Sequence, residues 1–284
     1  MLPFTKMHGA GNDFVVLDGV RDALPAIEPI AERLCDRNLG IGADQLLVVR
    51  PSAAADFRME IFNADGSQVE MCANGIRAFY KYLRDHAHTE RDQIEVETLS
   101  GVVRPRWAGA DRVTVDMGLP ILAPAKIPTT LADGDGPVLD VPVTVGGDTL
   151  SVSSVSMGNP HAVVTVDDPE QAPVERWGPE LEHHPAFPNR VNVEFVAVRG
   201  RDRIEQRTWE RGTGETLACG SGACAVAVVS MLRGVVDREV TIALRGGDLR
   251  IAWPGPDASI EMTGPAAEVY TGQIPLAGLA RGER

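Results

Sequence analysis

Lysine is scarce in this sequence. Lys6, Lys81 and Lys126 are the only lysines among the 27 basic residues, and the other 24 (27 − 3) are arginines. A pyridoxal-phosphate enzyme needs a lysine for its Schiff base. None of the three lysines lies in a stretch typical of that role, so the sequence disfavours chemistry that depends on this cofactor.

Other absences exclude further classes of protein. The net charge is −13, so the chain lacks the clustered Lys and Arg of a surface that binds nucleic acid or an anionic membrane. No apolar run is long enough to span a bilayer, and the first residues lack the charged and apolar regions of a signal peptide. We therefore expect a cytoplasmic protein. Four cysteines in 284 residues are too few for a disulfide scaffold, so each is expected to be a thiol.

The residue pattern predicts a chain that is mostly β-structure with a few helices. The segment 119–137 is rich in proline and glycine and is the natural place for the chain to cross between domains. Helical patterns cover 25–37, 75–86 and 222–232. Valine-rich alternating or apolar runs predict strands at 14–17, 45–49, 94–99, 112–117, 141–145, 151–155, 162–166, 191–198, 204–209, 239–244 and 249–253.

Two copies of one pattern are separated by a constant interval. "GNDFVVLD" begins at Gly11 and "GNPHAVVTVD" begins at Gly158, and the interval from Asn12 to Asn159 is 147 residues (159 − 12). Cys72 and Cys219 are also 147 residues apart (219 − 72), and the same shift carries Gln45 onto Asn192, Asn63 onto Glu210 and Gly75 onto Gly222. Because separate matches share one shift, we expect two homologous half-domains that face each other. They comprise residues 1–118 with 264–284, and residues 119–263.

Each half-domain carries a cysteine directly before a turn of small residues and a helix. At a helix N-terminus the macrodipole and the unpaired N–H groups lower a thiol pKa and attract an anion. Cys72 and Cys219 are therefore candidate bases, each attached to a carboxylate-binding turn. Two opposed thiols suit a racemase or epimerase, in which one thiolate removes an α-proton and the other thiol donates one. Cys35 and Cys224 lie in apolar surroundings and are expected to be core residues, and no zinc-ligand spacing is present.

Five stretches, in chain order, resemble the diaminopimelate epimerase family. They are "HGAGNDFVVLD", "FNADGSQVEMCANGIRAF", "MGNPHAVV", "HHPAFPNRVNVEF" and "ERGTGETLACGSGACA". The resemblance implies an α+β fold of two pseudo-symmetric mixed α/β domains, each a curled sheet around a central helix, with the active site in the interdomain cleft. It also implies cofactor-independent epimerisation of LL-diaminopimelate to meso-diaminopimelate, in lysine and peptidoglycan-precursor synthesis, and no metal.

The resemblance also assigns residues. It implies that Cys72 and Cys219 are the catalytic pair, assisted by His161 and Glu210, and that the family's common homodimer has Tyr270 near its interface. From its own chemistry, Arg211 offers a bidentate fork for a distal carboxylate. The positions that match substrate-binding residues are Asn12, Gln45, Asn63, Asn74, Gly75, Asn159, Asn192, Glu210, Arg211, Gly220 and Ser221.

One departure and two alternatives stand beside this interpretation. The family usually has glycine after the first cysteine, whereas Ala73 stands here; a positive φ at this residue would strain the turn by roughly 1 kcal/mol. The first alternative is a thiol-based racemase or epimerase of another amino acid, such as a proline-type substrate. The second is a non-catalytic binding protein in which Cys72 and Cys219 form a disulfide.

Overall fold

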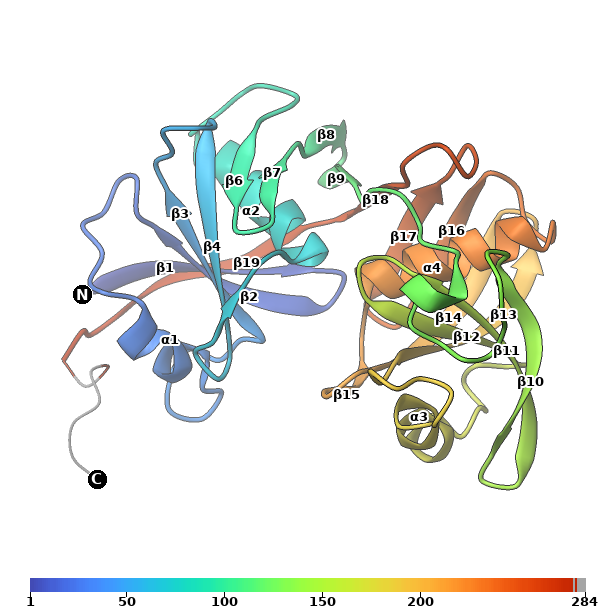
Figure 1. Ribbon diagram of the computed structural model, residues 1–284. Coiled ribbons are helices and arrows are strands. Elements are labelled where there is room, and N and C mark those ends of the chain that lie inside the picture. The colour runs from blue at the N-terminus through green and yellow to red at the C-terminus, as the bar shows by residue number, and fades with distance from the viewer. Residues whose placement is uncertain (278, 280–284) are drawn as a thin grey trace. The chain divides into compact units, whose positions relative to one another are not determined.

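The computed structural model describes residues 1–277 and 279, and the chain divides into two compact units (Figure 1). The first unit is Met1–Val115 with Gly264–Arg284, and the second is Asp116–Thr263. The first boundary follows Val115, where the sequence predicted it after Gly118. The end of the predicted first half-domain, at residues 278 and 280–284, lies outside the described residues.

The first unit is built on one mixed sheet with the strand order β19-β1-β2-β3-β4-β6-β7, and β5 pairs with β4. Helix α1 packs on β3 and β4, and helix α2 packs on β1 to β4 and on β19. The strands β8 and β9 pair as an antiparallel hairpin. The elements are β1 Leu2–Gly9, β2 Asn12–Asp18, α1 Glu28–Cys35, β3 Gln45–Arg50, β4 Phe57–Asn63, β5 Gln68–Val69, α2 Ala73–Asp85, β6 Val96–Thr98, β7 Gly101–Val103, β8 Arg106–Gly109, β9 Arg112–Asp116 and β19 Ala267–Ile274.

The second unit repeats this plan with the order β10-β11-β12-β13-β14-β16-β17-β18, and β15 pairs with β14. A short 3₁₀ helix, Pro124–Lys126, precedes the sheet. The elements are β10 Val138–Val145, β11 Asp148–Ser156, β12 Pro160–Thr165, α3 Val174–Glu182, β13 Asn192–Gly200, β14 Arg203–Glu210, β15 Gly214–Thr216, α4 Gly220–Leu232, β16 Glu239–Leu244, β17 Gly247–Ala252 and β18 Glu261–Pro265.

The 147-residue shift holds for whole elements. It carries both ends of α2, Ala73 and Asp85, onto both ends of α4, Gly220 and Leu232. The two sheets share a strand order from β1 to β7 and from β11 to β17, and β18 extends the second sheet beyond this shared part. The place of β10 in the second unit is taken in the first by β19, which comes from the other end of the sequence. The first unit is therefore completed by the returning C-terminal strand.

The sheet of the second unit curls around α4. This helix contacts both β11 and β17, which are five strand spacings apart in the sheet order. In a flat sheet that separation would be roughly 24 Å at about 4.8 Å per strand, more than twice the width of a helix, which is about 10 Å. The sequence of α4 fits this position because it consists of small and apolar residues, and only Ser221 and Leu232 are not buried.

Several helices and strands of the structure were not predicted from the sequence. It predicted no helix at α3, because Gly178 and Pro179 interrupt the apolar pattern, yet Val174–Glu182 is helical. The strands β1, β4, β18 and β19 were also missed. Of these, β19 is exposed along most of its length and has no buried face to impose a period of two. Among the described residues, no helix has both the length and the apolar character needed to cross a membrane.

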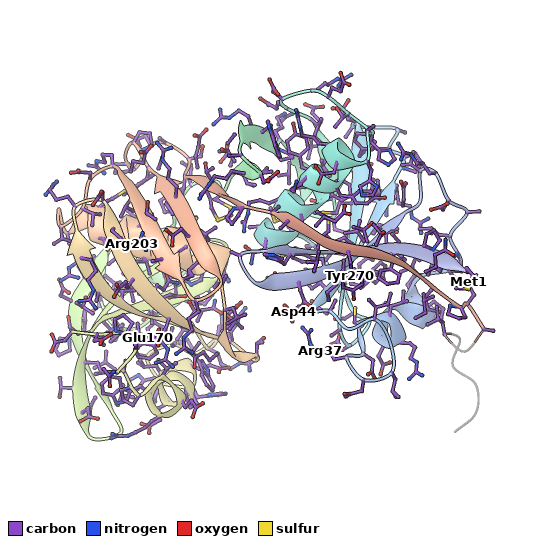
Figure 2. The ribbon with its side chains drawn as sticks, turned by 180° about the vertical axis from the view of Figure 1, so that it is seen from behind. Met1, Arg37, Asp44, Glu170, Arg203 and Tyr270 are labelled. Atoms are coloured by element: carbon purple, nitrogen blue, oxygen red, sulfur yellow. The ribbon has the colours of Figure 1, made fainter. Side chains whose placement is uncertain are left out.

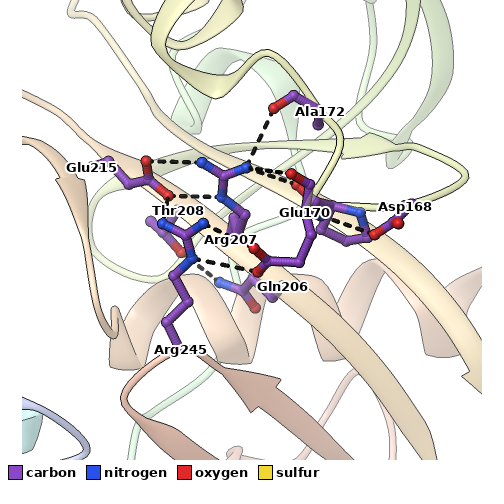
Figure 3. A network of polar contacts seen from close by, with 9 residues as sticks. Asp168, Glu170, Ala172, Gln206, Arg207, Thr208, Glu215 and Arg245 are labelled. Atoms are coloured by element: carbon purple, nitrogen blue, oxygen red, sulfur yellow. Dashed lines mark hydrogen bonds and ion pairs between the residues drawn. The ribbon is translucent and has the colours of Figure 1, made fainter.

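A polar network in the second unit ties β15 to its surroundings (Figure 3). The Arg207 guanidinium donates to both Glu215 oxygens, at 2.7 and 2.9 Å, and to backbone carbonyls that include Pro169 O at 3.0 Å. Arg245 joins Glu215 to Glu170, at 2.8 and 2.9 Å. The Arg207 side chain is only 10% exposed, so these charge-assisted bonds hold the segment that leads to Cys219.

We expect Arg207→Ala to lower the free energy of unfolding by about 2–3 kcal/mol, because it leaves Glu215 and three carbonyls short of a charged donor. Arg203→Ala is the matched control on the same strand. Its pair with Asp248 is 3.0 Å long but about half exposed, so its removal should cost less than about 1 kcal/mol. Urea unfolding of both variants is the measurement, and equal losses of stability would contradict the assignment of the network.

Candidate active site

Cys72 caps the helix α2. Its backbone is extended, with φ −137° and ψ 118°, and its sulfur accepts a hydrogen bond from the N–H of Gly75 at 3.3 Å. A sulfur in this position replaces the Ser, Thr, Asp or Asn oxygen that usually satisfies a free N–H at a helix start. The site is one in which a thiolate is favoured by the helix dipole.

Cys219 caps α4 in the same way. Its φ and ψ are −116° and 111°, and its sulfur accepts from the N–H of Gly222 at 3.3 Å. The Ser221 hydroxyl lies 3.5 Å from the sulfur. The two cysteine turns therefore have one geometry, although Cys219 is buried and Cys72 is partly exposed.

Ala73 fits the first turn without strain. It is the first residue of α2, and it is not among the residues with a positive φ. Only a left-handed conformation would have required glycine here. The departure from the family pattern therefore costs the turn nothing in backbone energy.

In the first unit, the amide side chains of the predicted site form two groups, one of which contacts the Cys72 turn. Asn12 Oδ1 lies 3.8 Å from Cys72 Sγ and accepts from Asn74 Nδ2 at 3.2 Å. Gln45 and Asn63 lie opposite each other on β3 and β4, and Gln45 Nε2 donates to Asn63 Oδ1 at 3.0 Å. Two polar groups thus form: Asn12 and Asn74 with the cysteine, and Gln45 with Asn63.

Asn12 is itself held by residues that sequence reasoning missed. Its Nδ2 donates to Asp44 Oδ2 at 2.8 Å. Arg37 then bridges Asp13 and Asp44, with distances of 2.7 Å to each, and lies beside Asp44 in Figure 2. Nearby positive charge on Arg37 and Lys6 holds the pKa of Asp13 far below its usual range, although burial opposes this shift. The turn that presents Asn12 is therefore fixed by ion pairs.

In the second unit, a chain of polar side chains leads to Cys219. Asn159 Nδ2 donates to Ser221 Oγ at 3.4 Å, and Asn159 Oδ1 lies 2.9 Å from His161 Nε2. His161 Nδ1 lies 2.8 Å from Glu194 Oε1, and both of these side chains are fully buried. Sequence reasoning missed Glu194.

The remaining residues of the predicted site lie where β13 begins and where β14 ends. Asn192 Oδ1 accepts from the Arg211 backbone N–H at 2.9 Å, while Arg211 Nη1 donates to Asn189 O at 3.0 Å. The Arg211 side chain keeps further donors for a ligand. Glu210 accepts from Thr216 Oγ1 at 2.6 Å.

Burial governs the ionisation of the second cysteine and its neighbour. Burial raises the pKa of Glu210, although hydrogen bonds from Thr216 and Cys219 oppose the shift. Burial also raises the pKa of the Cys219 thiol well above its usual range, and the carboxylates of Glu210 and Glu194 add to the effect. Cys219 therefore holds its proton at neutral pH.

The four cysteines are free thiols. Within residues 1–277 and 279, no group of three or more His, Cys, Asp or Glu side chains is arranged to hold a metal ion. The groups that the structure places at the two turns are thiols, helix-start N–H groups and amides.

Comparison with known proteins gives these turns a context. The sequence profile of the family described as "Diaminopimelate epimerase" matches residues 4–123 and 153–269. The chain is similar to the diaminopimelate epimerase of Moorella thermoacetica, with 49% identity over 96% of this chain and 99% of that protein. It is equally similar to that of Azotobacter vinelandii, with 49% identity over 97% of this chain and 100% of that protein.

Solved structures show a similar fold at low sequence identity. A Bacillus anthracis phenazine biosynthesis protein of the PhzF family aligns with a TM-score of 0.70 and 16% identity, over 97% of this chain and 99% of that chain. A hydroxyproline epimerase from Agrobacterium vitis aligns with a TM-score of 0.67 and 16% identity, over 98% of this chain and 94% of that chain. Together with the two mixed sheets, these likenesses confirm the predicted fold class.

Proposed function

Because the chain belongs to the diaminopimelate epimerase family, we propose that it is an isomerase that interconverts LL- and meso-diaminopimelate, a step in lysine and peptidoglycan-precursor synthesis. The observation that carries the proposal is the duplicated cysteine turn, with a sulfur at the start of α2 and another at the start of α4. A carbon can be inverted by one group that removes the proton from one face and a second that donates a proton to the other face, and a duplicated turn supplies two such groups.

We propose a two-base mechanism without a cofactor. The Cys72 thiolate takes the α-proton from one face, and the electron pair of the broken C–H bond remains on the α-carbon. The Cys219 thiol holds its own proton, because burial and nearby carboxylates raise its pKa. It donates this thiol proton to the opposite face of the α-carbon. The enzyme is left with a Cys72 thiol and a Cys219 thiolate, which run the reverse reaction.

The same proposal assigns the binding residues. The N–H groups at Asn74, Gly75, Gly220 and Ser221 lie at helix starts, so they can hold the reacting carboxylate and stabilise its negative charge as the proton leaves. The amides of the two units can donate to a carboxylate and accept from an ammonium. Arg211, whose guanidinium keeps free donors, would bind the distal carboxylate.

A homodimer in the cytoplasm completes the proposal. Within the described chain β19 pairs with a strand on one side only, and it exposes Val269 by 55% and Tyr270 by 46%. Tyr270, labelled in Figure 2, packs edge-on against Phe4 with ring centroids 6.0 Å apart. An unpaired strand edge with exposed apolar side chains suits a second copy of the chain, and sedimentation equilibrium would measure it. Two catalytic thiols need the reducing conditions of the cytoplasm.

The substrate is tested by α-proton exchange. The reduced protein is placed in D₂O without any cofactor and offered LL-diaminopimelate, proline, lysine and glutamate separately. We expect deuterium at the α-carbon of diaminopimelate alone, with formation of the meso isomer. Exchange with proline or another amino acid alone would replace the proposed substrate, and exchange with none of the four would contradict an isomerase function.

A further inference from the structure

Glu194 is a buried carboxyl group that the mechanism above does not use. It lies on β13 with no exposed surface, and its Oε1 is 2.8 Å from His161 Nδ1. Its other oxygen, Oε2, has no hydrogen-bond partner among the described residues. Burying an ionisable group with one oxygen unsatisfied is costly, so its presence needs an explanation.

Hydrogen-bond direction fixes the protonation of His161. Asn159 donates through Nδ2 to Ser221 Oγ, so its Oδ1 faces His161 Nε2 and can only accept. The His161 Nε2 must therefore carry a proton. On the other side of the ring, Nδ1 and Glu194 share one further proton across 2.8 Å. Glu194 thereby fixes the orientation of the imidazole, with Nε2 turned toward Asn159.

The same carboxyl group lies directly against the Cys219 turn. A Cβ atom added to Gly222, the residue whose N–H binds the sulfur, would lie 2.6 Å from Glu194 Oε1 and 3.2 Å from Cys219 Sγ. From Glu194 a continuous series of contacts runs through His161, Asn159 and Ser221 to the sulfur. All of these residues belong to the second unit.

The first unit shows that the fold does not need this pair. The 147-residue shift carries Phe14 onto His161 and Leu47 onto Glu194, and Phe14 and Leu47 are both fully buried. Leu47 Cδ2 lies beside Gly75 as Glu194 Oε1 lies beside Gly222. An apolar pair therefore packs behind the Cys72 turn. His161 and Glu194 therefore stand at positions that apolar side chains can fill in this fold.

We propose that Glu194 is a positioning residue for the epimerase reaction. It holds the His161 ring with Nε2 facing Asn159 Oδ1, so that Asn159 and Ser221 are oriented toward Cys219. This inference rests on the proposed function, since it assigns Glu194 to the thiol that transfers the proton on one face. The two halves of the enzyme thus differ: a buried histidine and carboxyl group lie behind Cys219, and Phe14 and Leu47 occupy the equivalent positions of the first unit.

The test is the variant Glu194→Gln, which keeps the size of the side chain and removes its charge. We expect kcat to fall on the order of 10²-fold, as for the loss of positioned acid–base chemistry, with KM unchanged because Glu194 does not touch substrate. Glu194→Leu, which introduces the residue found at the equivalent position of the first unit, should fold and show the same kcat loss. Wild-type kcat in both variants would overturn the inference.

Asp18→Asn is the matched control. Asp18 Oδ2 lies 2.7 Å from His88 Nε2, and the two side chains are only 7% and 5% exposed. This buried carboxyl–histidine pair lies at the end of β2 opposite to Asn12. Its loss should leave kcat unchanged while lowering stability. An equal fall of kcat in Asp18→Asn and Glu194→Gln would reduce Glu194 to a structural role and overturn the inference.

A substrate-free readout separates this inference from the proposed function. Mass spectrometry measures the rate at which iodoacetamide alkylates each cysteine at fixed pH. Because the Glu194 carboxylate helps to raise the pKa of Cys219, with Glu210 remaining in place, Glu194→Gln should speed alkylation of Cys219 and leave that of Cys72 unchanged. Unchanged alkylation of Cys219 would overturn the inference, whereas an inactive wild-type enzyme with altered Cys219 alkylation would overturn only the proposed function.

Discussion

We expect that Cys72→Ala and Cys219→Ala each lower epimerisation below detection. The loss of rate should be on the order of 10³-fold or more, as expected when a positioned acid or base is removed. Each thiol performs one half of the transfer, so neither can replace the other. The double variant should be no worse than either single variant, because residues that act as a unit are non-additive. Conversion of LL- to meso-diaminopimelate, followed by chiral chromatography, is the measurement.

Cys224→Ala and Cys35→Ala are the controls for the cysteine variants. Both thiols are buried in apolar surroundings, and Cys224 lies on the same helix as the Cys219 turn. Their replacement should reduce stability by about 1 kcal/mol and leave kcat unchanged. If either Cys72→Ala or Cys219→Ala kept near wild-type turnover, the two-thiol mechanism would be wrong.

The second large effect is expected from Gly222→Ala. The added methyl group would lie 2.6 Å from Glu194 Oε1 and 3.2 Å from Cys219 Sγ, so the turn must move. Overpacking of this kind costs about 1–3 kcal/mol. Since the displaced atoms are the sulfur and its support, kcat should fall on the order of 10²-fold, as when a catalytic group is misplaced by about 1 Å.

Gly75→Ala is the same substitution in the other half and serves as its control. Its added Cβ would lie 3.3 Å from both Leu47 Cδ2 and Cys72 Cβ and 3.6 Å from Cys72 Sγ, so it is less crowded than the Cβ added at Gly222. Replacement of glycine by alanine within a helix gains up to about 1 kcal/mol, which offsets the crowding. Because the Gly75 N–H belongs to the proposed carboxylate site, we expect kcat to fall, but by less than in Gly222→Ala. Equal losses of kcat in Gly75→Ala and Gly222→Ala would contradict this prediction, because the two turns would then tolerate an added methyl group equally.

Much of the fold could be predicted from local pattern and from the repeat. The helices α2 and α4 were predicted because each has an uninterrupted helical pattern that follows a cysteine and a turn of small residues. The helix α3 was missed because Pro179 disturbs its pattern, yet the 147-residue shift of α1, Glu28–Cys35, falls on Glu175–Glu182. The repeat therefore contained a signal that the local pattern lacked. The strand β19 could not be predicted in this way, because it replaces β10 from the opposite end of the chain.

The candidate site was predictable where its residues belong to a local motif. Cys72 and Cys219 act through the turn that follows each of them, so a short stretch of sequence defines their geometry. Glu194 and Arg37 act across strands or between loops, and their partners depend on sheet register and on loop conformation. The pairing of Phe14 with His161 and of Leu47 with Glu194 under the shift was the available signal for Glu194. Its meaning became clear only when the distances were known.

The most direct test of the central claim follows deuterium at early times in D₂O, starting from unlabelled LL-diaminopimelate. If one thiol removes the proton and the other delivers a solvent-derived proton, the first meso product carries deuterium at its inverted α-carbon, and the remaining LL substrate carries none. This is the result that we predict. Deuterium appearing in the remaining LL substrate as fast as in the meso product would contradict it, because one base would then serve both faces of the carbon.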